Sequence, residues 1–404
     1  MPDLAPFRGL RYADRSALSA VTAPPYDVIE DDERVALEES DPHNAVRLIL
    51  PRAGAAGDAY ASAAATLAAW RADKVLTLDQ KPSFTVYRMT APRPGGGEHH
   101  TIGVIGALGL PERDGMGDIL PHERTLPKAR SDRLALLRAT RANLDPIWAL
   151  SLAPGLTDLL ADVPCPAVAV DGDGTRHEFG VLDDPARLDA IRSLVAGAPA
   201  VLADGHHRFE TVCAYRDEAP DTRGADAIMT LVVELADDQL DVHPIHRIVR
   251  KAPPKLRERL AATCVVMDAG PNTPAGVGRL LEGMARRRAV GLVDAKGLAL
   301  VVPIDAALTR GLASEPSALH GVDAARFDAV VRPALGDAAL TYRNDAKTVA
   351  AVVREGGADA AVLLRGVSVE QIRVAAAAGI RMPEKTTFFA PKPRTGIAFR
   401  ALDD

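Results

Sequence analysis

The stretch Val201-Leu-Ala-Asp-Gly-His-His-Arg-Phe-Glu-Thr-Val212 joins two sequence patterns through a short polar turn. The apolar run from Pro199 to Ala203 predicts a strand, Asp204-Gly205 predicts a tight turn, and Phe209 to Arg216 predicts a helix. A strand, a turn and a helix in this order can direct backbone N–H groups and an arginine at an anion. The stretch therefore predicts an anion-binding site, with the rest of the chain as its scaffold.

Length and charge limit the kind of protein that surrounds this turn. A chain of 404 residues is long enough for about two domains. The net charge of -6 and the pI near 6.0 give no electrostatic reason to expect a nucleic-acid partner. We therefore expect a small-molecule substrate and no nucleic acid, and the sequence leaves a homodimer open.

The cysteines and the apolar runs indicate the compartment. Cys165, Cys213 and Cys264 are scattered and form no Cys-x-x-Cys pair, so neither a disulfide framework nor a zinc knuckle is indicated. The N-terminal residues lack a signal-peptide pattern, and no stretch reaches the roughly 18 apolar residues that a membrane-spanning helix needs. We expect a cytoplasmic protein with no membrane contact.

Strand and helix patterns alternate along the chain. Phe84 to Thr90 and Thr101 to Leu110 predict a hairpin, and Ala227 to Glu234 predicts a strand buried on both faces. Asn44 to Leu50 predicts a further strand, and a basic helix is predicted from about Pro127 to Asn143. This mixture indicates a mixed α/β (α+β) fold.

The two prolines of Lys251-Ala-Pro-Pro254 mark a candidate domain boundary, because helix and strand patterns alternate regularly beyond them. We expect a phosphate-binding domain over residues 1–250 and an α/β region over residues 251–404. Prolines stiffen the last segment, so we expect residues 380–400 to fold back onto the site and to offer Lys385 and Thr386 to an anion. A plain final strand with solvated lysines is the alternative.

Three other loops carry residues suited to binding or proton transfer. Two prolines fix the backbone before Tyr26 and Asp27, which we interpret as substrate-binding residues, with a purely structural turn as the alternative. His122 and Glu123 precede a predicted helix and indicate an acid–base pair, with a solvated charged face as the alternative. Arg247, in a histidine-bearing strand pattern, is a further substrate-binding candidate.

Several well-known motifs are missing from the sequence. It has no Gly-x-x-x-x-Gly-Lys-Ser/Thr, no Gly-x-Gly-x-x-Gly after a strand and no Gly-x-Ser-x-Gly. Zinc is an alternative, because His206 and Glu210 stand at i and i+4 and His243 or His246 could complete a site. The His-Glu-x-x-His arrangement is absent, so we assign no metal site. Magnesium carried in with a nucleotide needs only one or two carboxylates, such as Asp204.

Five blocks of the chain resemble the hallmark blocks of a widespread bacterial and archaeal family that is catalogued as a domain of unknown function. The blocks are Pro24-Pro-Tyr-Asp-Val28, His122-Glu123, Ala203-Asp-Gly-His-His-Arg208, His246-Arg247, and Met382-Pro-Glu-Lys-Thr-Thr-Phe-Phe-Ala-Pro-Lys392 with Thr395-Gly396. They occur in the family's order and cover nearly the whole chain. The family itself carries little information on function.

The Asp204-Gly-His-His-Arg208 block also resembles the nucleotide-phosphate motif of the ParB and sulfiredoxin superfamily, most closely the version in its free-serine kinases. The resemblance implies a ParB/sulfiredoxin-like core, with Asp204 as a catalytic residue. The implied phosphate binders are Gly205, His206, His207 and Arg208. These kinases also use a glutamate from an earlier segment, and we assign Glu123, with His122 beside it, from its position and neighbours.

Phosphoryl transfer needs positioning and charge neutralisation more than covalent chemistry. We therefore predict a small-molecule phosphotransferase of the kinase type, with free L-serine or a similar hydroxylated metabolite as acceptor. ATP, ADP or pyrophosphate is the expected donor, with Mg²⁺ brought in by that donor. A non-catalytic nucleotide-responsive binding module and a phosphoester hydrolase are the alternatives.

Overall fold

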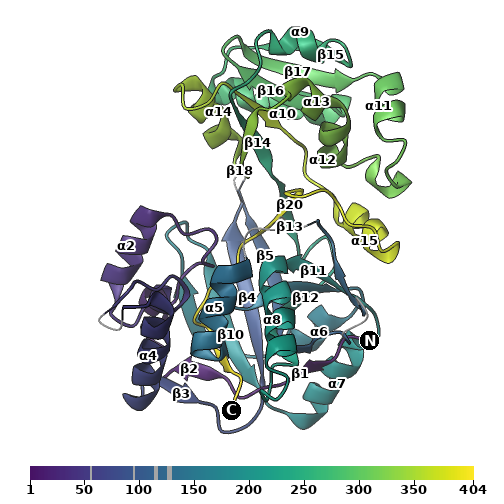
Figure 1. Cartoon of the computed structure of the whole chain (residues 1–404). Coiled ribbons are helices and arrows are strands. Elements are labelled where there is room, and N and C mark those ends of the chain that lie inside the picture. Colours follow the sequence, from purple (N-terminus) through teal and green to yellow (C-terminus); the bar gives the residue numbers. More distant parts are fainter. Residues whose placement is uncertain (55–56, 94–95, 113–116, 125–129) are drawn as a thin grey trace. The chain divides into compact units, whose positions relative to one another are not determined.

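A computed structural model describes the whole chain apart from residues 55–56, 94–95, 113–116 and 125–129. The fold is mixed α/β, as predicted, and the chain divides into two compact units (Figure 1). Unit 1 comprises Met1–Pro121, Thr125–Asp241 and Pro391–Asp404. Unit 2 comprises His122–Arg124 and Val242–Ala390. The chain therefore returns to unit 1 after it has built unit 2.

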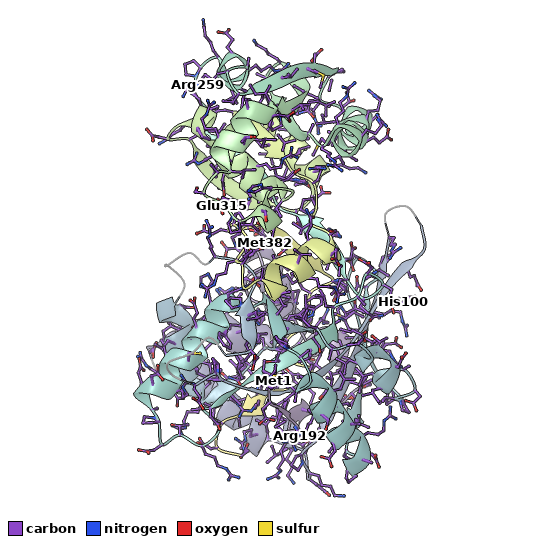
Figure 2. The ribbon with its side chains drawn as sticks, turned by 90° about the vertical axis from the view of Figure 1, so that its right-hand side faces the viewer. Met1, His100, Arg192, Arg259, Glu315 and Met382 are labelled. Atoms are coloured by element: carbon purple, nitrogen blue, oxygen red, sulfur yellow. The ribbon has the colours of Figure 1, made fainter. Side chains whose placement is uncertain are left out.

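A nine-stranded sheet forms the centre of unit 1, in the order β6-β11-β8-β12-β5-β4-β10-β9 with β1 paired to β5. The strands are β1 (Leu4–Ala5), β4 (Phe84–Pro92), β5 (Glu98–Gly109), β6 (Ile119–Pro121), β8 (Ile147–Ser151), β9 (Ala167–Val170), β10 (Arg176–Leu182), β11 (Ala200–Asp204) and β12 (Ala227–Glu234). The predicted hairpin is confirmed, because β4 and β5 pair antiparallel. His100, labelled in Figure 2, lies in the first part of β5.

Helices pack against this sheet, and α5 and α8 lie side by side over it (Figure 1). The helices of unit 1 are α1 (Leu18–Val21), α2 (Asp31–Ser40), α3 (Val46–Ile49), α4 (Ala59–Ala72), α5 (Arg130–Thr140), α6 (Leu156–Leu160), α7 (Pro185–Val195) and α8 (His206–Glu218). Leu137 of α5, and Val212 and Tyr215 of α8, share a buried core with Ile147 of β8. Two small ribbons complete the unit: β2 (Leu10–Tyr12) with β3 (Leu76–Leu78), and β7 (Ala142–Asn143) with β21 (Arg400–Ala401).

The predicted strand from Asn44 to Leu50 is wrong, because this segment forms the short helix α3. The Asn44 side chain explains the difference: its Oδ1 accepts a hydrogen bond from the Val46 backbone N–H at 2.9 Å. Such a local bond between side chain and backbone favours a helical turn over an extended strand. The apolar residues of α3 are buried, and burial alone does not distinguish a strand from a helix.

The predicted basic helix is shorter than its charge pattern indicated. It forms α5 over Arg130–Thr140, and Asn143 belongs to the ribbon strand β7. The predicted start at Pro127 lies outside the described residues. The helix ends because Arg141 adopts a left-handed backbone, with a φ of 49°.

Unit 2 has a six-stranded antiparallel sheet in the order β15-β17-β16-β19-β14-β18. Its strands are β14 (His246–Arg250), β15 (Cys264–Gly270), β16 (Val290–Asp294), β17 (Gly297–Pro303), β18 (Ala339–Arg343) and β19 (Ala360–Leu363), and β13 (Asp241–Pro244) pairs separately with β20 (Thr387–Ala390). The helical segments are α9 (Leu256–Leu260), α10 (Pro274–Arg287), α11 (Asp305–Gly311), η1 (Ser317–Leu319), α12 (Asp323–Arg326), η2 (Phe327–Val331), α13 (Arg332–Leu335), α14 (Ala346–Arg354) and α15 (Val369–Ala377). α10 and α14 cover the sheet through a core that includes Leu280 and Val349.

Candidate functional site

A bulge, a glycine and a helix start place the motif residues of unit 1. The pairing of β11 with β8 shifts its register between Leu202 and Asp204, and such a bulge re-aims the side chain that follows it. Gly205 comes next with a φ of 89°, in the left-handed region that favours glycine. A Cβ atom on Gly205 would lie 2.6 Å from Cγ2 of Ile147, so a larger residue requires a displacement.

Helix α8 begins three residues earlier than the sequence pattern indicated. We predicted a start at Phe209, but α8 begins at His206 because the left-handed Gly205 serves as its N-cap. The first turn of the helix therefore consists of His206, His207 and Arg208. Gly205 provides no side-chain cap, and the macrodipole and free N–H groups of a helix start favour an anion.

Asp204 lies at the end of β11 between two cations. Its Oδ1 accepts a hydrogen bond from Nζ of Lys392 at 2.5 Å, and its Oδ2 accepts one from Nη2 of Arg208 at 3.0 Å. Burial by itself raises the pKa of Asp204, but Lys392 and Arg208 outweigh burial and lower this pKa to about 2. Asp204 is therefore a fixed negative charge, which orients a neighbouring group better than it accepts a proton.

Arg208 is buried, and its guanidinium is held by acceptors of the protein. Besides Asp204, it donates from Nη1 to Oδ2 of Asp145 at 2.5 Å and to the carbonyl oxygen of Pro146 at 2.8 Å. Burial raises the pKa of Asp145, and the charge of Arg208 opposes that rise. Sequence reasoning missed Asp145, because an Asp-Pro pair is common in loops and no spacing links it to Arg208.

Tyr26 and Asp27 adjoin this group of charges. The Cζ atom of Arg133 lies 4.3 Å from the centre of the Tyr26 ring, and that of Arg208 lies 5.9 Å from it, which are cation–π distances. Burial raises the pKa of Tyr26 to about 12, so its hydroxyl stays neutral. The charge of Asp27 acts on both Arg208 and Asp145. The Tyr26 ring and the Asp27 carboxylate therefore belong to the same charged cluster as Arg208 and Asp145.

Lys392 was not among the predicted site residues. Within residues 380–400 we predicted Lys385 as the anion-binding lysine, and it lies in unit 2. Lys392 lies in unit 1, where its Nζ is 2.5 Å from Oδ1 of Asp204. Pro391 and Pro393 flank Lys392 and fix the local backbone on both sides. This bracketing by two prolines is the signal that could have identified Lys392.

Glu123 is the centre of a second cluster, which lies in unit 2. Its carboxylate accepts hydrogen bonds from the backbone N–H groups of Lys385, Thr386 and Thr387 at 3.1, 3.2 and 2.7 Å, and from the Thr387 hydroxyl at 2.6 Å. Lys385 has a φ of 56°, and a left-handed residue helps successive N–H groups to converge on one anion. The Glu123 carboxylate therefore takes the place that an external anion would have in this turn.

His122 is buried beside Glu123. Its Nε2 lies 2.7 Å from Oγ1 of Thr387. Because the Thr387 hydroxyl donates its proton to Glu123, Nε2 of His122 is the donor in this contact. The backbone around both residues is fixed as well, because Met382, labelled in Figure 2, pairs with His122 and Arg124 through main-chain hydrogen bonds.

Arg247 supports the same loop from the other side. It is buried, and its guanidinium donates to the carbonyl oxygens of Lys385 at 2.8 Å and Glu384 at 3.3 Å. The rings of Phe327 and Tyr342 lie 5.4 and 5.5 Å from its Cζ atom. Burial lowers the pKa of Arg247, with carboxylates such as Asp328 opposing the change. These N–H groups of the Arg247 guanidinium therefore form hydrogen bonds with backbone carbonyl oxygens.

The predicted site residues fall into two groups, each connected inside its own unit. Unit 1 holds Tyr26, Asp27, Asp204, Gly205, His206, His207 and Arg208. Unit 2 holds His122, Glu123, Arg247, Lys385 and Thr386.

Within the described ranges, no three or more His, Cys, Asp or Glu side chains gather closely enough to hold a metal ion. Nδ1 of His207 lies 3.9 Å from Oε2 of Glu210, one turn along α8. In the same part of the chain, no helix combines the length and the apolar character needed to cross a bilayer.

The fold and these contacts define a mixed α/β protein with a charged, glycine-containing turn between strand β11 and helix α8. The chain belongs to the family described as "Protein of unknown function (DUF1015)", whose model matches residues 4–320. This match confirms the family resemblance, and four of the five sequence blocks lie within the matched residues. No curated protein matches the chain by sequence.

Three solved structures with weak similarity to this chain carry different names. A mutant free serine kinase in complex with ADP has a TM-score of 0.40 at 12% identity, over 73% of this chain and 92% of its own. A conserved hypothetical protein from Pyrococcus furiosus has a TM-score of 0.39 at 13% identity, over 75% and 96%. A C-terminally truncated SbnI from Staphylococcus aureus has a TM-score of 0.38 at 11% identity, over 72% and 85%.

Proposed function

We propose that unit 1 binds the phosphates of ATP, ADP or pyrophosphate and transfers a phosphoryl group to the hydroxyl of a small metabolite. Free L-serine is the first candidate acceptor, because the Asp204-Gly-His-His-Arg208 block resembles that of free-serine kinases. The observation that carries the proposal is the position of Lys392. Nζ of Lys392 bonds to the carboxylate of Asp204. Directly after Asp204, the left-handed Gly205 forms the N-cap of helix α8.

The donor phosphates would bind at the start of α8. The first N–H groups of a helix have no partner within the helix, and together with the macrodipole they form an anion site. His206 adds donors of its own in this turn, and its charge acts on Asp204. Lys392 Nζ, only 2.5 Å from Asp204, provides a compact positive charge for a phosphate oxygen. Backbone donors and a lysine around the phosphates recur in sites of phosphoryl transfer.

Asp204 would act on the acceptor hydroxyl. The hydroxyl oxygen attacks the terminal phosphorus, its proton passes to Asp204, and the bond from phosphorus to the bridging oxygen breaks. With a pKa of about 2, Asp204 is a poor proton acceptor while Lys392 pairs with it. When a phosphate draws the lysine away, burial acts with less opposition and the pKa of Asp204 rises. Proton transfer would then follow donor binding.

Arg208, Tyr26 and Asp27 complete the proposed site in different ways. Arg208 positions Asp204, because its guanidinium also bonds Asp145 and is held in place. Tyr26 and Asp27 stay our candidates for contacting the acceptor. Mg²⁺ bound to the donor would neutralise phosphate charge, and it needs only one or two protein carboxylates. Asp204 fits this requirement once Lys392 has turned to a phosphate.

The residues of unit 2 keep their predicted roles as proposals. His122 and Glu123 were predicted as catalytic, and Lys385 and Thr386 as phosphate binders. The four hydrogen bonds of Glu123 support a role in holding the loop of Lys385 to Thr387 in shape. Arg247 was predicted to bind substrate, and its bonds to the same loop support a positioning role.

One observation favours a second candidate function, a nucleotide-responsive binding module without catalysis. Asp204 is held by two cations and its pKa is lowered to about 2, which suits a structural anion better than a base. In such a module, the phosphate would compete with Asp204 for Lys392 and release the segment that follows Pro391. The two functions differ in whether phosphate is transferred.

Phosphorus NMR of the purified protein with L-serine and ATP, ADP or pyrophosphate decides between them. The phosphotransferase predicts phosphoserine with the wild type and none with Asp204→Asn. Asp221→Asn, at an exposed loop position of unit 1, is the matched control and should behave like the wild type. Saturable nucleotide binding without product across a broad panel of hydroxylated acceptors would leave the binding module as the function.

A further inference from the structure

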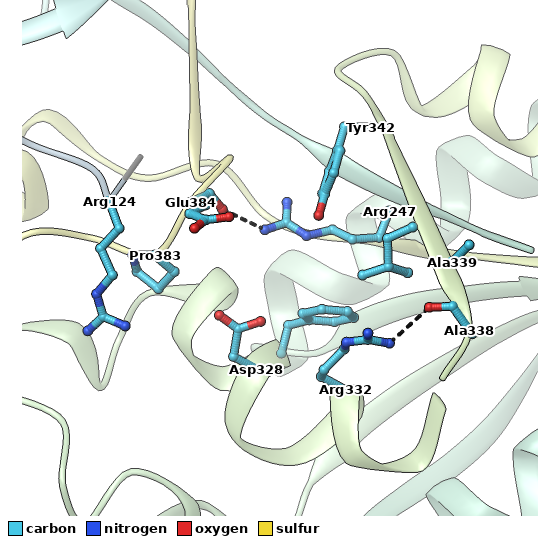
Figure 3. A pocket seen from close by; sticks show the side chains of 11 residues that line it. Arg124, Arg247, Asp328, Arg332, Ala338, Ala339, Tyr342, Pro383 and Glu384 are labelled. Atoms are coloured by element: carbon cyan, nitrogen blue, oxygen red, sulfur yellow. Dashed lines mark hydrogen bonds between the residues drawn. The ribbon is translucent and has the colours of Figure 1, made fainter. Parts of the chain in front are cut away.

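A cavity of about 420 Å³ lies within unit 2, and the residues that line it belong to that unit. The lining residues used below are Arg124, Arg247, Phe327, Asp328, Arg332 and Glu384 (Figure 3). A cavity of this volume falls in the range of small-molecule sites, roughly 300–1,000 Å³. The charged groups in its wall indicate a polar ligand.

A distorted helix forms one wall of the cavity. Between α12 and α13, the segment Phe327–Val331 is a π-turn, in which the N–H of Arg332 donates to the carbonyl of Phe327 five residues earlier. Pro333 explains the distortion, because proline has no N–H and its ring clashes with the carbonyl four residues before it. π-turns inside helices are frequent at functional sites. Here the turn carries Phe327, Asp328 and Arg332 to the cavity.

The lining contains both signs of charge. Arg124 and Arg332 carry positive charge, and each is tethered: Nη2 of Arg124 lies 3.2 Å from Glu315, and Nη1 of Arg332 donates to backbone carbonyls. Asp328 adds a carboxylate. Burial raises its pKa and the charges of Arg247 and Arg124 oppose that rise, and within the described ranges no side chain forms an ion pair with it at 4 Å or less. Figure 3 shows its carboxylate pointing toward the space between Glu384 and Arg247.

We propose that this cavity binds a free α-amino acid as a zwitterion. Its ammonium group would bind Asp328, and its carboxylate would bind Arg124 and Arg332. A ligand with both charges meets opposite groups of the lining, whereas a simple anion would bring like charge to Asp328. Arg247, held by the backbone carbonyls of Glu384 and Lys385 and lying over the Phe327 ring, keeps the wall in shape. The proposal concerns binding in unit 2 and holds whether or not unit 1 transfers phosphate.

Isothermal titration of the full-length protein with a panel of L-amino acids tests the proposal. At least one amino acid should bind saturably. Its methyl ester, which lacks the carboxylate charge, and its N-acetyl derivative, which lacks the ammonium, should each bind at least tenfold more weakly. Inorganic phosphate should not compete. If no amino acid binds at millimolar concentration, or if the N-acetyl form binds equally well, the proposal is wrong.

Two variants and two matched controls locate the binding. Asp328→Asn removes the ammonium partner and Arg124→Ala removes a carboxylate partner, and each should weaken amino-acid binding about tenfold or more. Asp305→Asn and Arg310→Ala alter exposed charges of unit 2 outside the cavity and should bind like the wild type. ADP binding measured on the same variants reports unit 1 separately. Unchanged amino-acid affinity in both cavity variants would contradict the assignment.

Discussion

Replacing Lys392 by methionine removes the cation closest to the half-buried carboxylate of Asp204. In the intact protein the pKa of Asp204 falls from 3.8 to about 2, and a shift of this size corresponds to roughly 2 kcal/mol of stability at pH 7. Because the folded pKa lies below the unfolded one, this contribution is present above about pH 4 and is lost as the pH falls toward 2. Because Lys392 is the largest of the charges that lower this pKa, ahead of Arg208 and His206, Lys392→Met should lower the free energy of unfolding of unit 1 by an amount on the order of 2 kcal/mol at neutral pH.

The two tryptophans make the measurement specific. Trp70 and Trp148 both lie in unit 1, and Trp148 pairs with Asp204 in the sheet, so their fluorescence in urea follows this unit. The difference in unfolding free energy between Lys392→Met and the wild type should shrink below pH 4. Lys81→Met, an exposed lysine of unit 1, should change stability by less than about 0.5 kcal/mol. An unchanged stability of Lys392→Met at pH 7, or a difference that does not vary with pH, would refute the reasoning.

Three further predictions concern backbone and titration. Gly205→Ala should destabilise unit 1 by about 1–3 kcal/mol in the same fluorescence assay, because it strains a left-handed backbone and crowds a packed side chain. Glu123→Gln should speed tryptic cleavage after Lys385 at least about fivefold, because a neutral amide holds the loop less well. Burial lowers the pKa of His246 to about 4, so the unfolded state binds more protons between pH 6.5 and 4 and unit 2 loses stability as the pH falls. The protection factor of the Leu364 amide, whose N–H donates to Nδ1 of this histidine, should fall over that range, and should fall less in His246→Gln.

The regular elements of the fold were the easiest part to predict. Alternating patterns identified the β4–β5 hairpin, and the apolar run ending at Ala203 identified β11. The errors arose where local bonds decide the backbone. Asn44 turns an apolar run into a helix through its own side chain, and Gly205 starts α8 before the apolar pattern begins. Neither effect is visible in hydrophobic periodicity.

The candidate site was only partly predictable for a related reason. The block that contains Asp204 and Arg208 stood out because its charged residues lie next to each other in the sequence. Asp145 and Lys392 are far from it along the chain, and only the fold brings them to it. Glu123 was predicted as a catalytic residue, which stays a prediction, and its bonds to consecutive backbone N–H groups could not be inferred from residue types. The proposed domain boundary near residue 250 stays a prediction.

Titration of ADP into the wild type and Lys392→Met tests the central claim most directly. If the start of α8 and Lys392 hold donor phosphates, the wild type binds ADP saturably and Lys392→Met binds it about tenfold or more weakly, while Lys81→Met is unchanged. The affinity of the wild type should also fall as salt is added, because the site acts through charge. Equal ADP affinity in Lys392→Met and the wild type, or no ADP binding at all, would contradict the claim.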